Sequence, residues 1–462
     1  MTVLPYTLKS YVVLTELLGR RAKDPTLRDP DVANAVTALK NRRDRYKDDL
    51  VGCNGDDKKQ QKVKEAFRAD RLKLREARDE ATTRALNAAL DQLNTELEGT
   101  KFSWVLAQGE TVAGKLTYQI GASLHLQIAS KQVESVVRSA ILTPVTERNG
   151  VIRALQQALD RKYKHGVIRL DLKSYFESIP HDGIRAALVA SSRIDTVTRE
   201  LVDQLIQEFA VLTGNDHGVP RGVGISSALA DLYLSDFDRK LRTMPGVAFY
   251  ARYVDDIIVV TQAADQMAGI SSMISDLLVR LGLEKNASKS FDLTTNDKGQ
   301  YTQGRAEIEY LGYTFSRPGG HTSLETRLTP KRTDRYVRKI ECAFDSWLRS
   351  KPSAERANTG SDGLLIKRIR FLSTNTRLHN SKSGVSVGIY FSNSALPESA
   401  PQLQELDCRL TQLIEQHKGK MSERLETRLR QQSFVSGFKQ RAFLRYSPKD
   451  LQQISRCWEH IV

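Results

Sequence analysis

Apolar and charged residues recur with helical spacing in the first part of the chain. Between residues 30 and 98, glycine, asparagine and aspartate in the stretch VGCNGDD (51–57) predict a turn that divides two long helices. In the second helix, apolar side chains recur at steps of three and four positions, on one face. That stripe consists of Val63, Phe67, Leu74, Leu86, Leu90, Leu93 and Leu97. We expect a helical hairpin that packs on the protein's own body, with a coiled-coil surface for a partner as the alternative.

The pattern changes between about 122 and 325, where short runs of strand-forming residues alternate with helical segments. Strands are predicted at 166–172, 248–253, 257–260 and 306–315. Helices are predicted at 182–210, 225–242 and 265–282. Beyond residue 328 most segments are basic and helical, except 384–393 (GVSVGIYFSN), where alternating apolar residues predict one strand.

The charge is concentrated in the last part of the chain. The 462 residues carry a net charge of +15, and residues 331–462 alone hold 24 basic against 13 acidic side chains. Such an excess is expected of a surface that binds a polyanion such as nucleic acid, although a solvated surface is the alternative. Four scattered cysteines give no disulfide framework, no stretch could span a bilayer, and we therefore expect a cytoplasmic protein.

Two adjacent carboxylates interrupt an apolar run in FYARYVDDIIVV (249–260). Burying neighbouring carboxylates is costly, and either protonation or a metal cation relieves their repulsion. If 248–253 and 257–260 form a hairpin, Asp255 and Asp256 lie at its tip. Mg²⁺ binds one or two protein carboxylates together with substrate phosphates, so a further acid is expected at another strand end.

That acid is Asp171, at the end of GVIRLDL, with Phe176 five residues later. Asp171 and Asp255 could together hold two ions about 3.5–4 Å apart, an arrangement that activates a 3′-hydroxyl and stabilises leaving pyrophosphate. Each motif alone is weak evidence; their order along the chain strengthens the interpretation.

Five ordered blocks resemble the palm of a reverse transcriptase: DLKSYF, GVPRGVGISSALADLYL, the YVDD box, LEKNASKS and EYLGYTF. The resemblance implies an α+β, right-hand polymerase with fingers, palm and thumb. The expected layout is a helical N-terminal region at 1–100, fingers and palm at 101–325, and a basic, mostly helical thumb and extension at 326–462. The implied activity is RNA-directed DNA polymerase, a nucleotidyltransferase that uses Mg²⁺, with Mn²⁺ as a substitute.

The resemblance also implies roles for individual residues. Asp171 and Asp255 would coordinate the ions, helped by the carbonyl of Leu172, with Asp256 a weaker ligand. Lys289 would donate a proton to pyrophosphate or bind it, although lysines are also common on solvated helices. Residues implied to contact the nucleotide are Phe176, Arg221, Gly222 and Ser226. Phe176 would exclude a 2′-hydroxyl, with a core aromatic as the alternative.

The second block departs from the common family pattern. Retroviral, retron and group II intron enzymes usually carry Pro-Gln-Gly there, whereas this chain has Pro220-Arg221-Gly222. The sequence of this block is similar to that of bacterial defence-associated and abortive-infection reverse transcriptases of the unknown groups. That class includes enzymes that copy an associated non-coding RNA and enzymes that synthesise DNA without a template.

The expected partners are dNTPs, an RNA template or non-coding RNA and the DNA product, with a second copy of the chain as a further candidate, but no membrane. The basic residues expected to contact nucleic acid are Arg335, Arg338, Lys339, Lys367, Arg368 and Arg370. Two other functions stay open: a non-catalytic nucleic-acid-binding scaffold derived from a polymerase, and an RNA-dependent RNA polymerase.

Overall fold

The structure, a computed structural model, describes residues 25–99, 101–112, 114–141, 147–161, 163–296, 300–301, 307–317, 323–350, 361–377 and 386–461. The start of the N-terminal region and of the predicted strand at 384–393 lies outside these residues. The chain forms two compact units that alternate along the sequence. The first comprises Met1–Pro144, Leu172–Lys240 and Asp276–Glu284, and the second comprises Val145–Asp171, Leu241–Ser275 and Lys285–Val462. The division into three successive domains stays a prediction.

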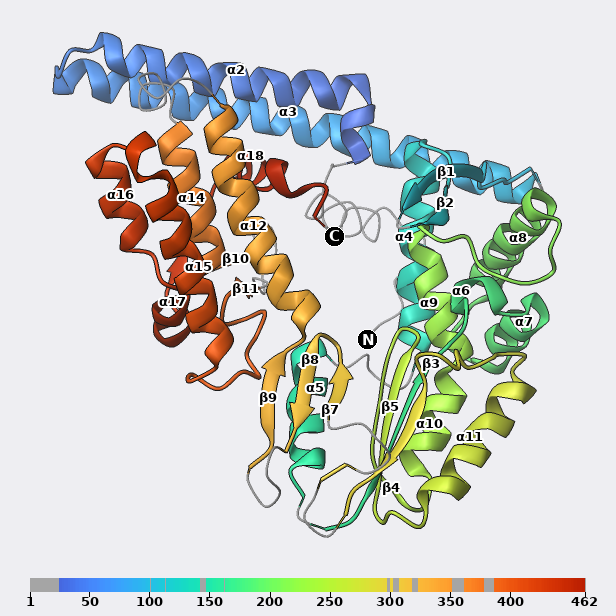
Figure 1. Ribbon diagram of the computed structural model, residues 1–462. Helices are drawn as coiled ribbons and strands as arrows, with labels where there is room; N and C mark the ends of the chain where they lie inside the picture. Colours follow the sequence, from blue (N-terminus) through green and yellow to red (C-terminus); the bar gives the residue numbers. More distant parts are fainter. Residues whose placement is uncertain are drawn as a thin grey trace. The chain divides into compact units, whose positions relative to one another are not determined.

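A helical hairpin begins the first unit after a short 3₁₀ turn, η1 (Pro25–Arg28). Helices α2 (Pro30–Gly52) and α3 (Asp57–Glu98) run side by side, as the turn residues predict (Figure 1). The side chains of Asp29 and Asp56 cap the two helices by accepting hydrogen bonds from backbone N–H groups of the first turn. The rings of Tyr46 and Phe67 stack at 4.0 Å and join the hairpin near its turn.

The second half of α3 supplies most of the hairpin's buried surface. Ala81, Ala85, Leu86, Ala89 and Leu93 are buried, and this part of the helix packs on α4 (Leu124–Ala140). Small alanines at three- and four-residue steps let the two helices approach closely. The prediction that the hairpin packs on the protein's own body is confirmed, and the alanines extend the apolar stripe seen in the sequence.

The rest of the first unit is a short strand hairpin with a group of helices. The strands are β1 (Ala107–Val112) and β2 (Lys115–Gln119), and the helices are α6 (Tyr175–Ser178), α7 (His181–Ala190), α8 (Thr196–Thr213) and α9 (Gly224–Tyr233). The single helix predicted at 182–210 is therefore wrong, because Asp195 caps a new helix by accepting a hydrogen bond from Thr198 N. The helix predicted at 225–242 is also divided, at Leu234, into α9 and α10 (Ser235–Thr243).

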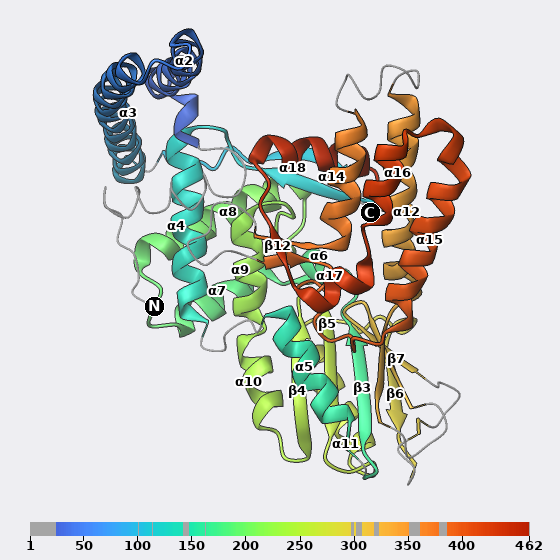
Figure 2. The ribbon, with the colours of Figure 1, turned by 90° about the vertical axis from the view of Figure 1, so that its left-hand side faces the viewer.

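A four-stranded antiparallel sheet with strand order β4-β5-β3-β6 forms the centre of the second unit. Its strands are β3 (Gly166–Asp171), β4 (Val247–Tyr253), β5 (Asp256–Thr261) and β6 (Phe291–Thr294). The run from Ile257 to Val260 is buried, and α5 (Arg148–Leu159) packs against β4 (Figure 2). The predicted strand and hairpin are confirmed, and the helix predicted at 265–282 is α11 (Met267–Arg280).

The predicted extended segment at 306–315 is two strands joined by a tight turn. Strands β7 (Glu307–Tyr310), β8 (Tyr313–Ser316) and β9 (Glu325–Leu328) form a three-stranded antiparallel sheet. Leu311 and Gly312 form the turn with φ values of 46° and 77°. Two successive residues with positive φ are typical of the tight turns that fit the twist of a hairpin.

Helices dominate the remainder of the second unit, as the sequence predicts. They are α12 (Pro330–Arg349), α14 (Ser361–Ser373), α15 (Pro401–His417), α16 (Glu423–Arg430), α17 (Phe434–Gln440) and α18 (Pro448–Ser455), with 3₁₀ turns η2 (Lys418–Lys420) and η3 (Arg456–Trp458). Their apolar faces share one core with the four-stranded and three-stranded sheets. No described helix is long and apolar enough to cross a membrane.

A second small sheet joins these helices, with strand order β11-β10-β12. Its strands are β10 (Asn375–Arg377), β11 (Ser386–Gly388) and β12 (Phe443–Leu444). The strand predicted at 384–393 is too long: β11 ends at Gly388, whose φ is 130°. A turn follows, in which Asn393 N donates to the carbonyl of Tyr390 at 2.8 Å.

Candidate active site

The turn between β4 and β5 presents the paired aspartates. Tyr253 pairs with Asp256 across the hairpin, so Val254 and Asp255 form a two-residue turn. Val254 has φ of 62°, a left-handed conformation in which a β-branched side chain is strained. Glycine is the residue that such a position ordinarily prefers. The hairpin therefore holds Asp255 and Asp256 in place at a cost in backbone strain.

Asp171 on β3 lies directly opposite Asp256 on β5 in the register of the sheet. Residues opposite each other in an antiparallel pair have Cβ atoms about 4.5–5.5 Å apart, and like charges there destabilise the sheet. Both side chains are largely withdrawn from water, with 12% of the Asp171 side chain and 17% of the Asp256 side chain exposed. The fold thus brings the strand-end acid to the hairpin that carries the other two.

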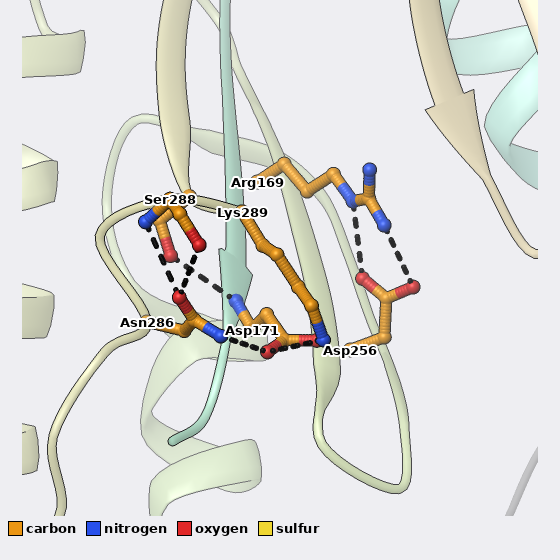
Figure 3. Close-up of polar contacts among 7 residues, drawn as sticks. Arg169, Asp171, Asp256, Asn286, Ser288 and Lys289 are labelled. Atoms are coloured by element: carbon orange, nitrogen blue, oxygen red, sulfur yellow. Dashed lines mark hydrogen bonds and ion pairs between the residues drawn. The ribbon is translucent and has the colours of Figure 1, made fainter.

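Two cationic side chains offset this repulsion (Figure 3). Arg169 donates from Nε and Nη2 to the two carboxylate oxygens of Asp256, each at 3.2 Å. Lys289 donates from Nζ to both oxygens of Asp171, each at 3.3 Å. Each acid therefore has its own cation, and the bidentate contact of Arg169 fixes the plane of the Asp256 carboxylate.

The segment after α11 holds Asp171 through neutral hydrogen bonds. Asn286 donates from its backbone N to the carbonyl of Asp171 at 2.7 Å and from Nδ2 to Oδ2 of the same residue at 3.2 Å. The backbone N of Asp171 donates to Ser290 Oγ at 3.2 Å. Ser288 in turn orients Asn286, because its N and Oγ both donate to Asn286 Oδ1 (Figure 3). This segment fixes the position of the carboxylate from both its backbone and its side chain.

Burial raises the pKa of Asp256 above its ordinary value. Arg169 opposes that rise, whereas the negative charges of Asp171 and Asp255 add to it. Desolvation favours the neutral acid, and nearby carboxylates act in the same direction. Asp255 is therefore close enough for its charge to affect Asp256. The negative charges of Asp171 and Asp255 repel that of Asp256, and a bound cation would reduce this repulsion.

The donor chemistry of these three acids fits a hard divalent cation. In the described part of the chain, no three His, Cys, Asp or Glu side chains form a ready-made metal cage. Mg²⁺ does not need such a cage, because it takes one or two carboxylates and completes its shell with phosphates and water. Arg169 engages both oxygens of Asp256 in a bidentate contact, whereas the charged partner of Asp171 is the single ammonium group of the largely exposed Lys289.

The residues implied to contact the nucleotide lie together in the first unit. The Arg221 guanidinium lies over the Phe176 ring, 4.9 Å from its centroid, and donates from Nη2 to Glu177 Oε1 at 2.9 Å. Gly222 has φ of 98°, and a Cβ there would lie 2.9 Å from the carbonyl of Tyr118, so only glycine fits.

Ser226, which is also implied to contact the nucleotide, and Leu172, an implied metal ligand, are both buried in the first unit. Ser226 donates from Oγ to the carbonyl of Pro220 at 2.8 Å, a bond that closes the loop. The boundary between the units falls between Asp171 and Leu172, so the sequence neighbours Asp171 and Phe176 belong to different units.

The six predicted nucleic-acid contacts are divided between two helices, and their surroundings differ. On α12, Arg335 and Arg338 are exposed, and Lys339 lies over the Trp458 ring at 5.5 Å. On α14, Lys367 is exposed and pairs with Asp450 at 2.7 Å, whereas Arg370 is half-buried.

Arg368 is different, because only 5% of the residue is exposed. Its guanidinium donates to Ser346 Oγ and to the carbonyl of Gln453. This arginine ties α14 to the elements around it and offers no surface to a phosphate.

Several residues of the site are absent from the sequence predictions. Arg169 stands two positions before Asp171, and strand alternation places both on one face of β3, so the signal was present in GVIRLDL. Asn286 and Ser290 belong to the quoted block LEKNASKS, where the lysine alone was singled out. Tyr310, whose hydroxyl donates to the carbonyl of Asp256 at 3.1 Å, belongs to the quoted block EYLGYTF, but nothing in the sequence marks it as a contact of Asp256.

Comparison with known proteins identifies the middle of the chain. The family described as "Reverse transcriptase (RNA-dependent DNA polymerase)" matches residues 121–315. A search of curated proteins found no match. The matched range 121–315 includes the three aspartates, the block around Lys289 and the hairpin of β7 and β8.

Solved structures that resemble the chain include telomerases. The apo telomerase of Candida tropicalis truncated from its C-terminal domain matches at 12% identity with a TM-score of 0.35, covering 56% of this chain and 69% of that one. The Candida albicans telomerase in complex with a fragment of telomeric RNA matches at 13% identity with a TM-score of 0.35, covering 73% of this chain and 52% of that one. The apo C. tropicalis telomerase matches at 13% with a TM-score of 0.36, covering 72% and 55%. The chain thus spans only about half the length of the latter two.

Proposed function

Because residues 121–315 of this chain match the reverse transcriptase family, we propose that the chain is an RNA-directed DNA polymerase and that Asp171 and Asp255 form its catalytic centre, with Asp256 in support. One observation carries the proposal: Asp171 stands opposite Asp256 in the sheet, next to the turn that presents Asp255. Three carboxylates from two distant parts of the sequence thereby lie together where strands β3 and β5 meet the turn after β4. Their negative charge could hold the metal ions that nucleotidyl transfer uses.

The proposed roles follow from the contacts of each acid. Asp171 and Asp255 would hold divalent cations, with the carbonyl of Leu172 as a further ligand, and Mn²⁺ could substitute for Mg²⁺. When bound, such ions supply a lowered pKa for the attacking 3′-hydroxyl and charge neutralisation for pyrophosphate. Asp256 adds negative charge while Arg169 fixes its orientation.

Lys289 is the proposed partner of the leaving group. Its Nζ lies 3.3 Å from both oxygens of Asp171, and 60% of its side chain is exposed. The ammonium is therefore held at the carboxylate without being enclosed. From this position Nζ could donate a proton to pyrophosphate or bind it, as a positioned general acid does.

Selection of the sugar is proposed to depend on Phe176. Its ring would exclude a 2′-hydroxyl, and Arg221 together with Glu177 would hold that ring in one orientation. Gly222 and Ser226 shape the loop that receives the base pair. Dideoxy- and deoxynucleotides would be accepted and ribonucleotides rejected, which separates this proposal from an RNA-dependent RNA polymerase.

A primer-extension assay tests the catalytic centre. Purified full-length protein is given Mg²⁺ or Mn²⁺, dNTPs and either an RNA template with primer, its co-purifying RNA, or no template. We expect Asp171→Asn and Asp255→Asn to lose at least a thousandfold in rate. Asp292→Asn is the matched control, because Asp292 lies on β6 of the same sheet and pairs with Ile168 rather than with an acid.

The outcomes are distinct. Extension that disappears in both aspartate variants and persists in the control supports the centre. Equal activity of Asp255→Asn and the wild type would overturn it, whatever template is used. Product that requires the co-purified RNA and is complementary to it would indicate templated copying, and homopolymeric product without RNA would indicate untemplated synthesis.

We also propose that the enzyme acts in antiphage defence. The support is the sequence of the second block, in which Pro220-Arg221-Gly222 resembles the corresponding residues of defence-associated reverse transcriptases. Bacteria that express the wild type should show fewer phage plaques than bacteria that express Asp255→Asn. Equal plaque counts across a broad phage panel would count against this role. Protection by both proteins would instead favour a scaffold that does not use the aspartates.

A further inference from the structure

A basic cavity lies within the second unit, and none of the three aspartates lines it. Its volume is about 590 Å³, within the range of small-ligand sites. The turn of β7 and β8, the start of α12 and the end of α14 contribute to its lining. Five cationic side chains face it: Arg148, Lys331, Arg332, Arg335 and Lys339. No carboxylate lines it in the part of the chain that the structure describes.

The two innermost cations, Arg148 and Arg332, have only neutral partners among the described residues. Both guanidiniums lie over the buried ring of Tyr313, with carbon-to-centroid distances of 5.5 Å and 5.1 Å. Arg148 donates to the carbonyl of Leu311 and Arg332 donates to the carbonyl of Ser392. These contacts fix the geometry of the guanidiniums but leave their charge unneutralised.

One donor of the pair has no partner within the part of the chain that the structure describes. Nη1 of Arg332 is buried and makes no hydrogen bond to any described residue. An unpaired buried donor on a charged group is costly, and such groups are normally satisfied by a ligand or an ion. Gly312 preserves the space around it, because a Cβ at that position would lie 3.1 Å from Arg332 Nη1 and 3.3 Å from Arg148 Nη2.

Mutual repulsion adds to this cost. Burial lowers the pKa of Arg148, and the charge of Arg332 lowers it further. Burial also lowers the pKa of Lys339, with Arg335 contributing in the same direction. Like charges held close together without counter-charges favour the binding of an anion.

We propose that this cavity is a phosphate-binding site for the terminal phosphates of a nucleotide or of a nucleic-acid strand. Arg148 and Arg332 form its floor, where their planar donors match phosphate oxygens. Lys331, Arg335 and Lys339 add charge around them. Tyr336 and Phe371, which also line the cavity, supply aromatic surface beside the phosphates. None of the proposed catalytic residues belongs to this site.

Binding of tripolyphosphate to the full-length protein tests the site. The titration is done by calorimetry without divalent cation and with EDTA, so that metal-dependent binding at the aspartates makes no contribution. We expect saturable binding, weakened about tenfold or more in Arg332→Gln, because a charge-assisted hydrogen bond is lost. Arg335→Gln should weaken it by a smaller factor.

R335Q and a control variant, R428Q, guard against misfolding of R332Q and against effects of net charge. Arg335 is exposed and makes no hydrogen bond to a described residue, so R335Q removes charge from the cavity even if R332Q fails to fold. R428Q is the matched control: Arg428 is an exposed arginine on α16 that does not line the cavity. Thermal unfolding of each variant shows that it is folded.

Competition experiments then identify the source of the phosphate. Displacement of tripolyphosphate by ATP supports a free nucleotide, and preferential displacement by a 5′-phosphorylated oligonucleotide over its unphosphorylated form supports a strand end. Absence of saturable tripolyphosphate binding by the wild type would overturn the proposal. An equal loss in R428Q and in both cavity variants would also overturn it, because the binding would then depend on net charge alone.

Discussion

Asp171 and Asp256 stand opposite each other on adjacent antiparallel strands, and each is neutralised by a different cation. Arg169 lies on the same strand as Asp171, but its ion pair is with Asp256 on the neighbouring strand. The arrangement keeps two acids close together without a bound metal. It also makes their neutralisation separable, because the two cations can be removed one at a time.

Asp256→Asn should stabilise the metal-free protein at neutral pH. The pKa of Asp256 is raised in the folded state, so the folded protein holds this proton more tightly than the unfolded chain does. That contribution is fully present below the ordinary pKa of 3.8 and is lost as pH rises through the raised value. Asparagine resembles the protonated acid. Melting temperatures measured in EDTA from pH 3 to 8 should therefore diverge as pH rises, with the variant higher.

The same substitution at Asp292 is the control for that experiment, since it changes one acid in the same sheet outside the opposed pair. A D256N variant that melts below the wild type at pH 7 would contradict the prediction. It would mean that the attraction of Arg169 exceeds the cost of burying Asp256. Mg²⁺ should raise the melting temperature of the wild type, because a ligand that binds only the folded state stabilises it.

Val254→Gly should make the protein more stable and show that the turn is strained. A left-handed conformation at a non-glycine residue costs about 1–3 kcal/mol, whereas glycine costs about 0.5–1 kcal/mol in chain entropy. The strain is the larger of the two effects, so the free energy of unfolding should rise by about 1 kcal/mol. Urea denaturation measures it. Val211→Gly, on the exposed face of α8, should be destabilising instead.

Lys289→Gln should affect activity far more than stability. The lysine side chain is 60% exposed, and an ion pair of that kind contributes at most about 1 kcal/mol. A positioned proton donor contributes about a hundredfold or more to rate. Single-turnover nucleotide incorporation should fall by that factor with little change in melting temperature. Lys285→Gln, in the same segment and bonded to Ser275 Oγ, should retain its rate; equal losses would remove the special role of Lys289.

Arg221→Gln should relax the choice between deoxy- and ribonucleotides. The guanidinium over the Phe176 ring contributes about 0.5–1 kcal/mol, which corresponds to about a two- to fivefold change. Competition between dNTP and rNTP in one reaction measures the ratio. Phe176→Val should relax it more strongly. Arg185→Gln, which breaks ion pairs with Asp182 and Asp203 and has no cation–π contact with a described aromatic ring, should leave the ratio unchanged.

The sequence predicted the elements that local patterns determine. The alternating apolar runs of β3 and β5 and the turn after Gly52 carry strong local signals, and the structure confirms them. Predictions erred where one residue interrupts a continuing apolar pattern. Asp195 begins a new helix and Gly388 ends a strand, although the apolar spacing runs through both positions.

The site could be predicted only in part for a similar reason. The order of the acidic motifs indicated that Asp171 and the aspartate pair meet. Register and cross-strand partners depend on tertiary pairing, so the assignment of Arg169 to Asp256 was not visible in the sequence. The basic cavity has a still weaker signal, because Arg148 and Arg332 are far apart in the chain and become neighbours only over the ring of Tyr313.

The alternation of the two compact units along the chain limits how the protein can be divided experimentally. The polypeptide passes from one unit to the other five times, at residues 144, 171, 240, 275 and 284. No single cut releases either unit whole, so fragments expressed from one continuous stretch will lack pieces of their own core. Physical separation of the halves would instead require circular permutation or co-expression of several segments.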